Sequence, residues 1–94
     1  MDVTGRLRRI GDLKDEVVGH HVDWDTQRRA YRKTLHEVTA LGGEDAADEL
    51  TEWIEERTRS SGRLPKGRRV RQKGADICRE RGHPVSTNGW LGAD

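Results

Sequence analysis

Residues 63–91 read RLPKGRRVRQKGADICRERGHPVSTNGWL, and they contain the clearest start and stop signals of this 94-residue chain. Pro65 fits the first turn of a helix, because proline lacks the N–H group that this turn leaves unpaired. Gly82 is typical of the residue that follows a helix, and Pro84 prevents the helix from continuing. The pattern therefore predicts a basic helix over about residues 65–81.

The end of the same stretch has the signature of a tight turn. Asn88 and Gly89 lie between short strand-like residues, and an Asn-Gly pair favours a type I′ turn. We therefore expect a small β-hairpin over about residues 84–92. Trp90 would cover the core from this hairpin. The alternative is that the turn, with Thr87 and Asn88, lies near a phosphate backbone.

The N-terminal segment has apolar side chains at helical spacing, which predicts a first helix with Thr4 as its N-cap and Gly19 as its end. The residues of this stripe are Val3, Leu7, Ile10, Leu13 and Val17. A short strand over residues 17–22 is the alternative for the end of this segment.

Two more helices are predicted over residues 24–41 and from residue 44 to about residue 61. Gly42 and Gly43 separate them, so we expect an αα-hairpin. The earlier helix has a basic outer face, to which Arg28, Arg29 and Arg32 contribute. The later helix has its acidic residues on the arc opposite its apolar stripe.

The order of helix, helix, basic helix and hairpin over residues 44–92 resembles a winged helix-turn-helix. In that family the third helix enters the DNA major groove and the hairpin touches the backbone. Residues 77–86, ICRERGHPVS, are similar to the first half of a SAP motif, a small helical DNA-binding unit. The expected fold is all-α, a single domain over 1–94 with four short helices in a helix-turn-helix-like arrangement and a small C-terminal hairpin.

Composition predicts a thin core. Only 31% of the residues are hydrophobic, 37% are charged, and phenylalanine is absent. We expect the three tryptophans and Tyr31 to supply much of the bulk of the core. Because so small a chain buries a limited share of its surface, a homodimer is an open expectation.

Charge is divided between elements. Residues 44–56 contain seven acids and no base, whereas residues 63–81 contain eight bases and two acids, although the whole chain has a net charge of only +1. Such segregation indicates an interaction surface or a solvated helix face.

The basic helix presents an acid-free face around Ala75, and that face has the residue types of a recognition helix. Its expected nucleic-acid contacts are Arg68, Arg71, Gln72 and Arg79, with Lys66, Arg69 and Lys73 as further phosphate contacts. We therefore expect a non-enzymatic DNA-binding module, such as a small transcriptional regulator or accessory factor. The alternative is a protein-interaction module or homodimeric adaptor that docks through the acidic helix of residues 44–56.

Other functions have weaker signals. The soft metal ligands lack the close spacing of a zinc motif, and they are His20, His21, His36, Cys78 and His83. No nucleophile–base pattern or glycine-rich phosphate loop occurs, so we expect neither an enzyme nor a cofactor. One cysteine, no secretory segment and no long apolar run predict a cytoplasmic protein that does not enter a membrane.

Overall fold

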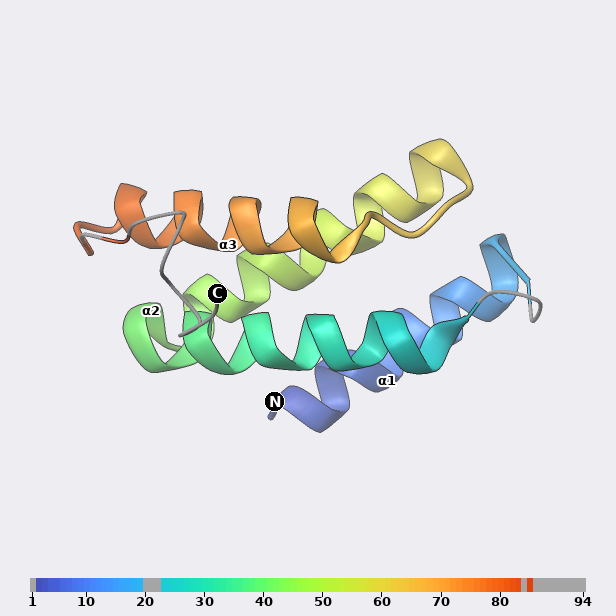
Figure 1. The fold of residues 1–94 in the computed structure, drawn as a ribbon, viewed down its shortest axis with the longest axis horizontal. Coiled ribbons are helices and arrows are strands. Elements are labelled where there is room, and N and C mark those ends of the chain that lie inside the picture. The colour runs from blue at the N-terminus through green and yellow to red at the C-terminus, as the bar shows by residue number, and fades with distance from the viewer. Residues whose placement is uncertain (1, 20–22, 84, 86–94) are drawn as a thin grey trace.

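The computed structural model describes residues 2–19, 23–83 and 85. These residues form three helices, α1 (Val3–Val17), α2 (Trp24–Ser61) and α3 (Gly67–Glu80), and they include no strand (Figure 1). The all-helical class is confirmed. The expected four-helix, helix-turn-helix-like arrangement with a C-terminal hairpin is wrong. Of the expected hairpin, residues 84–92, all but Val85 lie outside the described residues, and Val85 is not in a strand.

The helix count differs because α2 continues through the point where we expected a loop. Gly43 has φ 80° and ψ −173°, a conformation that is essentially restricted to glycine, and the helix resumes directly after it. The two predicted helices are therefore two arms of one bent helix, a first arm of residues 24–42 and a second arm of residues 44–61. Figure 1 shows the second arm leading back in the direction from which the first arm came.

Local signals explain where the helices begin and end. Asp2 caps α1 through a 2.8 Å hydrogen bond that its side chain accepts from the N–H of Gly5, so the expected cap at Thr4 is wrong. Asp23 caps α2 in the same way, accepting from the N–H of Thr26. Gly62 ends α2, as predicted.

The alternative strand over residues 17–22 does not appear in its described part, because Val17 is the last residue of α1. α3 begins slightly later than predicted. Pro65 lies before the helix, where its carbonyl oxygen accepts a hydrogen bond from the hydroxyl of Tyr31.

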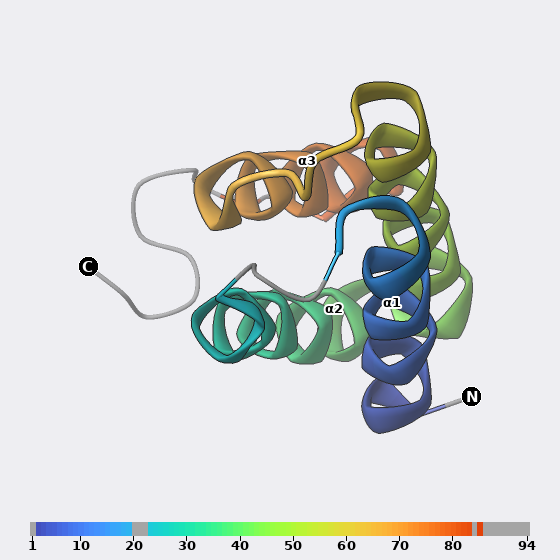
Figure 2. The same cartoon turned by 90° about the vertical axis from the view of Figure 1, so that its right-hand side faces the viewer.

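α1 and α3 both pack against α2. Figure 2 shows α3 above the first arm of α2, with α1 and the second arm together at their side. The chain is compact, with a radius of gyration of 12.6 Å, close to the roughly 12.4 Å expected of a folded domain of this length.

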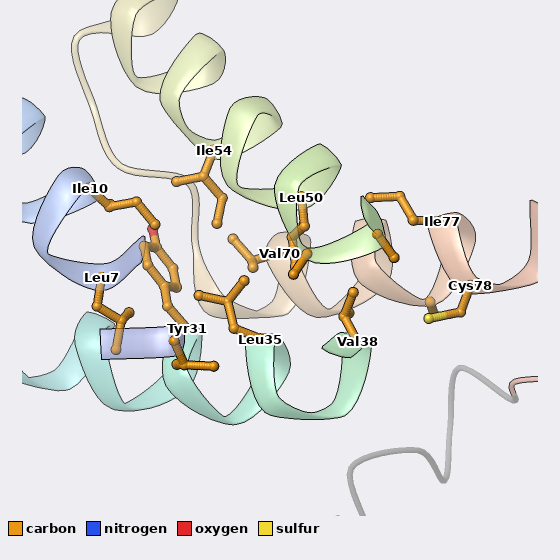
Figure 3. Packing of buried hydrophobic residues seen from close by; sticks show 14 residues of the cluster. Leu7, Ile10, Tyr31, Leu35, Val38, Leu50, Ile54, Val70, Ile77 and Cys78 are labelled. Atoms are coloured by element: carbon orange, nitrogen blue, oxygen red, sulfur yellow. The ribbon is translucent and has the colours of Figure 1, made fainter. Parts of the chain in front are cut away.

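One cluster of buried side chains joins all three helices (Figure 3). Tyr31 is fully buried in it, whereas Trp24 and Trp53 are only partly buried and pack at its edge. The expectation that tryptophans supply the bulk is therefore wrong for the described residues, because aliphatic side chains fill the centre. Burial raises the pKa of Tyr31 and also that of the Cys78 thiol, which lies inside the cluster as expected.

Candidate nucleic-acid interface

α3 buries a wider face than its sequence suggested. Val70 and Ile77 are buried as expected, but Ala75, placed at the centre of the predicted outward face, is also fully buried. The reason is that α3 packs against a bent partner, so that apolar contacts cover more of its circumference. The predicted acid-free face is therefore not one continuous exposed surface. Its residues are distributed over two flanks of α3.

One flank of α3 faces the first arm of α2 across a groove of about 200 Å³. The charged residues that line it are Lys33 from α2 and Arg68 and Arg71 from α3. Its other lining residues are the small Ala30, Thr34 and Gly67.

Close helix approach forms this groove. A Cβ atom placed on Gly67 would lie 2.9 Å from the Cβ of Ala30, nearer than side chains normally come, so glycine is needed there. The hydroxyl of Thr34 donates to the carbonyl of Ala30 at 3.1 Å, which satisfies this buried polar group within its own helix. The polar atoms that remain for a ligand in the groove are therefore mainly the cationic ends of Lys33, Arg68 and Arg71.

The groove carries unneutralised positive charge. Within the described part of the chain, no ion pair joins Lys33, Arg68 or Arg71 to an acid. The side chain of Lys66, the N-cap of α3, has no acceptor atom and so cannot cap the N–H groups of the first turn. Those N–H groups add positive potential near Gly67. On the first arm Arg29 lies one helical turn before Lys33, whereas Arg28 lines a different hollow, next to α1.

The opposite flank of α3 borders a larger hollow of about 460 Å³. Its lining comes from the second arm of α2 and from α3, and consists of Trp53, Arg69, Gln72, Lys73 and Asp76. The guanidinium carbon of Arg57 lies 5.8 Å from the centre of the Trp53 ring, at cation–π distance. This hollow therefore combines an aromatic ring with groups of both charges.

Arg79 belongs to neither opening. Its Nε donates to the carbonyl oxygen of Val85 at 2.7 Å, and its guanidinium also pairs with Asp76 at 2.8 Å. Of the predicted contacts, Arg68 and Arg71 are thus brought together in the groove, and Arg69, Gln72 and Lys73 in the hollow. Arg79 holds the end of α3 instead.

The acidic second arm is largely paired within the molecule. Arg6, only 1% exposed, donates to Glu44 at 2.6 Å and to Asp48. Two further ion pairs, Arg9–Glu55 at 2.6 Å and Arg81–Glu49 at 3.0 Å, engage the same arm. Sequence reasoning missed these pairs. The sequence offers one signal for them, because Arg6 lies among apolar residues on the inner face of α1, where a charged side chain needs an acidic partner.

The candidate metal ligands do not gather in one place in the part of the chain that the structure describes. Across residues 2–19, 23–83 and 85, no group of three or more potential ligands is close enough to hold a metal ion. His36 is exposed and His83 half-buried, while His20 and His21 lie outside the described residues. A third hollow, of about 310 Å³, lies between α1 and Trp24 and carries charges of both signs.

None of the helices described here combines the length and the apolar character needed to cross a bilayer. Comparisons of the chain with protein-family models, with curated proteins and with solved structures find no match.

Proposed function

We propose that this protein is a non-enzymatic module that binds nucleic acid, DNA in particular, through the groove between α3 and the first arm of α2. The observation that carries the proposal is the trio of Lys33, Arg68 and Arg71 around a small-residue floor, with no acid among the lining residues. Such a cradle suits a phosphate group, because lysine and arginine donate several charge-assisted hydrogen bonds to phosphate oxygens. A repeating phosphate backbone would extend the contact to Arg29, which lies one helical turn before Lys33.

The distribution of the acids supports the same function. Four of the seven acids of the second arm pair with arginines of α1 or with Arg81, which reduces their repulsion of a polyanion. The bases of the groove have no such partners among the described residues. The molecule therefore offers one side with unbalanced positive charge, although its total charge is nearly neutral.

A protein-interaction module that docks through residues 44–56 is the alternative. It has less support, since Glu44, Asp48, Glu49 and Glu55 already make ion pairs within the molecule. A basic partner would have to compete with these pairs, of which the contact to Arg6 involves a buried guanidinium. Only Asp45, Glu52 and Glu56 would remain to attract it.

The test is fluorescence anisotropy with labelled single- and double-stranded DNA over a series of salt concentrations. For each neutralised phosphate, the slope of log affinity against log salt is about −0.9 for duplex DNA and about −0.7 for a single strand. The double variant Lys33→Gln, Arg71→Gln should bind about tenfold or more weakly, with a slope less steep by about 2.

A matched variant, Arg8→Gln with Arg59→Gln, removes the same charge from exposed residues outside the groove. Its affinity should stay within about twofold of the unmodified protein, because neither residue lines the groove or the hollow beside α3, and salt screens exposed charges. Absence of binding to any DNA at low salt, or equal losses in both variants, would refute the groove as the binding surface.

A further inference from the structure

The hollow on the outer flank of α3 differs from the groove in a way that indicates a different part of the ligand. The groove has only cations among its charged lining residues, whereas the hollow contains Asp76 together with Arg69 and Lys73. A carboxylate repels phosphate but accepts hydrogen bonds from the amino groups of bases. The hollow is therefore better suited to a base than to the backbone.

Trp53 supplies a stacking surface for such a base. The ring packs against the core from the second arm and is only partly buried. The exposed side chain of Arg57 lies over this ring, with its guanidinium carbon 5.8 Å from the ring centre. An exposed cation–π contact of this kind is weak, so a base can displace it and stack on the indole.

The polar residues of the hollow match the edge of a base. The amide of Gln72 both donates and accepts hydrogen bonds, and the carboxylate of Asp76 keeps acceptor capacity beside its bond to Arg79. Arg69 and Lys73 are placed to contact the phosphates that flank the same nucleotide. The lining thus offers a stacking plane, an edge contact and backbone contacts together.

We infer that an unpaired nucleobase stacks on Trp53, so that the ligand of this protein is a single strand or carries a single-stranded segment. The inference rests on the proposed function and specifies the class of nucleic acid. Bases inside a duplex stack on one another and expose only their edges, so an aromatic face can receive a base only when it is unpaired. A strand that crosses α3 from the groove to the hollow would pass Arg68, Arg69 and Gln72.

The experiment compares the affinities of the full chain for a labelled single strand and for a hairpin duplex of matched sequence, each as DNA and as RNA. The single strand should bind more tightly. Trp53→Leu, which keeps an apolar contact with the core, should lose roughly 5- to 150-fold of single-strand affinity and less than about twofold of duplex affinity. Trp24→Leu, a matched change of another partly buried tryptophan, should leave both affinities unchanged.

A second measurement avoids altering Trp53. In a chain with Trp24→Phe and Trp90→Phe, Trp53 is the remaining tryptophan, and its fluorescence should be quenched when single-stranded oligonucleotide is added. Preference for the DNA or the RNA strand identifies the sugar. The stacking inference would be overturned if single strand and duplex bound equally, Trp53→Leu lost no affinity and no quenching occurred. The groove proposal would survive that result if the groove variants still bound more weakly. Absence of any binding would remove both proposals.

Discussion

Arg6 is a charged residue whose side chain is buried. Burial by itself lowers the pKa of its guanidinium, but hydrogen bonds from Arg6 to Asp48 and Glu44 outweigh that effect and raise the pKa. Both carboxylates are about half exposed, so solvent shares in stabilising them while the guanidinium is enclosed. These three side chains therefore link α1 to the second arm of α2, and the guanidinium is the one charged group among them that is removed from water.

The partner Asp48 should make stability depend on acidity. Its hydrogen bond from Arg6 holds the pKa of the Asp48 carboxyl below its usual value, which is about 3.9 in an unfolded chain. Because the folded pKa is the lower one, this contribution to the free energy of unfolding is fully present above about pH 5 and is lost as the pH falls through the folded pKa. Asp48→Asn removes it at every pH.

Urea unfolding at a series of pH values measures this dependence. The difference in free energy of unfolding between the unmodified protein and Asp48→Asn should be largest at neutral pH and shrink between about pH 5 and pH 2. Asp45→Asn is the control, since Asp45 is exposed on the same arm and makes no ion pair among the described residues. A difference that stays constant with pH would contradict the assignment.

Individual residues were predictable from the sequence where local chemistry decides their role. Gly62 as the end of a helix and Cys78 as a core residue follow from spacing and type. The partners of Arg6 were not predictable in this way, because Glu44 and Asp48 lie about forty positions further along the chain, at separations of 38 and 42. No helical periodicity reports which face of one helix meets another.

At the level of elements, the bend of α2 determines where everything else lies. A Cβ placed on Gly43 would meet no atom within 4 Å, so the requirement for glycine is conformational and not steric. The backbone there, at φ 80° and ψ −173°, is costly for any residue with a side chain.

Gly43→Ala should therefore lower the free energy of unfolding by about 1–3 kcal/mol, measured by urea denaturation followed by circular dichroism. Gly43→Asn should do no better, because asparagine tolerates the left-handed helical region and not this one. Gly62→Asn, at φ 71° and ψ 15°, is the informative contrast and should cost much less. Equal losses at positions 43 and 62 would argue against the bend as the cause.

The contact between Gly67 and Ala30 sets the spacing of α3 from the first arm. Gly67→Ala should cost about 1–3 kcal/mol by forcing these helices apart. Adding Ala30→Gly removes the opposing methyl group. The double variant should therefore lose about 1 kcal/mol less free energy of unfolding than the two single losses add up to. A double-mutant cycle in urea measures this coupling, and strict additivity would rule out the close contact.

The elements themselves were largely predictable, but their junctions were not. The break at Gly42 and Gly43 was located correctly, yet two glycines in sequence do not reveal whether a helix stops or bends. The exposed face of α3 was misplaced for a related reason. Ala75 is small and neutral, which suits both a close approach to DNA and burial against a second helix, and only the bent shape of α2 selects burial.

The whole molecule is held together by one cluster of apolar residues. Leu7 of α1 and Val70 of α3 belong to the same cluster, although their helices pack chiefly on α2 and not on each other. The fold should therefore unfold in one cooperative step.

Leu7→Ala tests this cooperativity, because it removes buried methyl groups from α1 at an expected cost of about 2–5 kcal/mol. Hydrogen exchange should show the most protected amides of α3 losing the same free energy as those of α1 and α2. Leu13→Ala, nearer the end of α1 and outside the central cluster, should cost less and act as a graded control. Retained protection in α3 while α1 exchanges freely would show two independent units.

For the whole molecule, the sequence predicted that acids and bases occupy different segments, but it did not predict that arginines of α1 pair with the acidic segment. Acidic and basic blocks are visible as strings of letters, whereas their neutralisation by Arg6 and Arg9 depends on the packing of α1. The groove and the hollow beside α3 could not be predicted either, since each combines residues from helices distant in sequence.

The pairing of the acidic arm by α1 also bears on the kinetics of an encounter. Positive charge remains unbalanced at the groove, while four of the seven acids of the second arm are ion-paired with Arg6, Arg9 and Arg81. A polyanion approaching from solution would be attracted by the groove and would be repelled less by this arm than by an arm with unpaired acids. Because two of these three arginines belong to α1, this helix would raise the association rate without contacting the ligand.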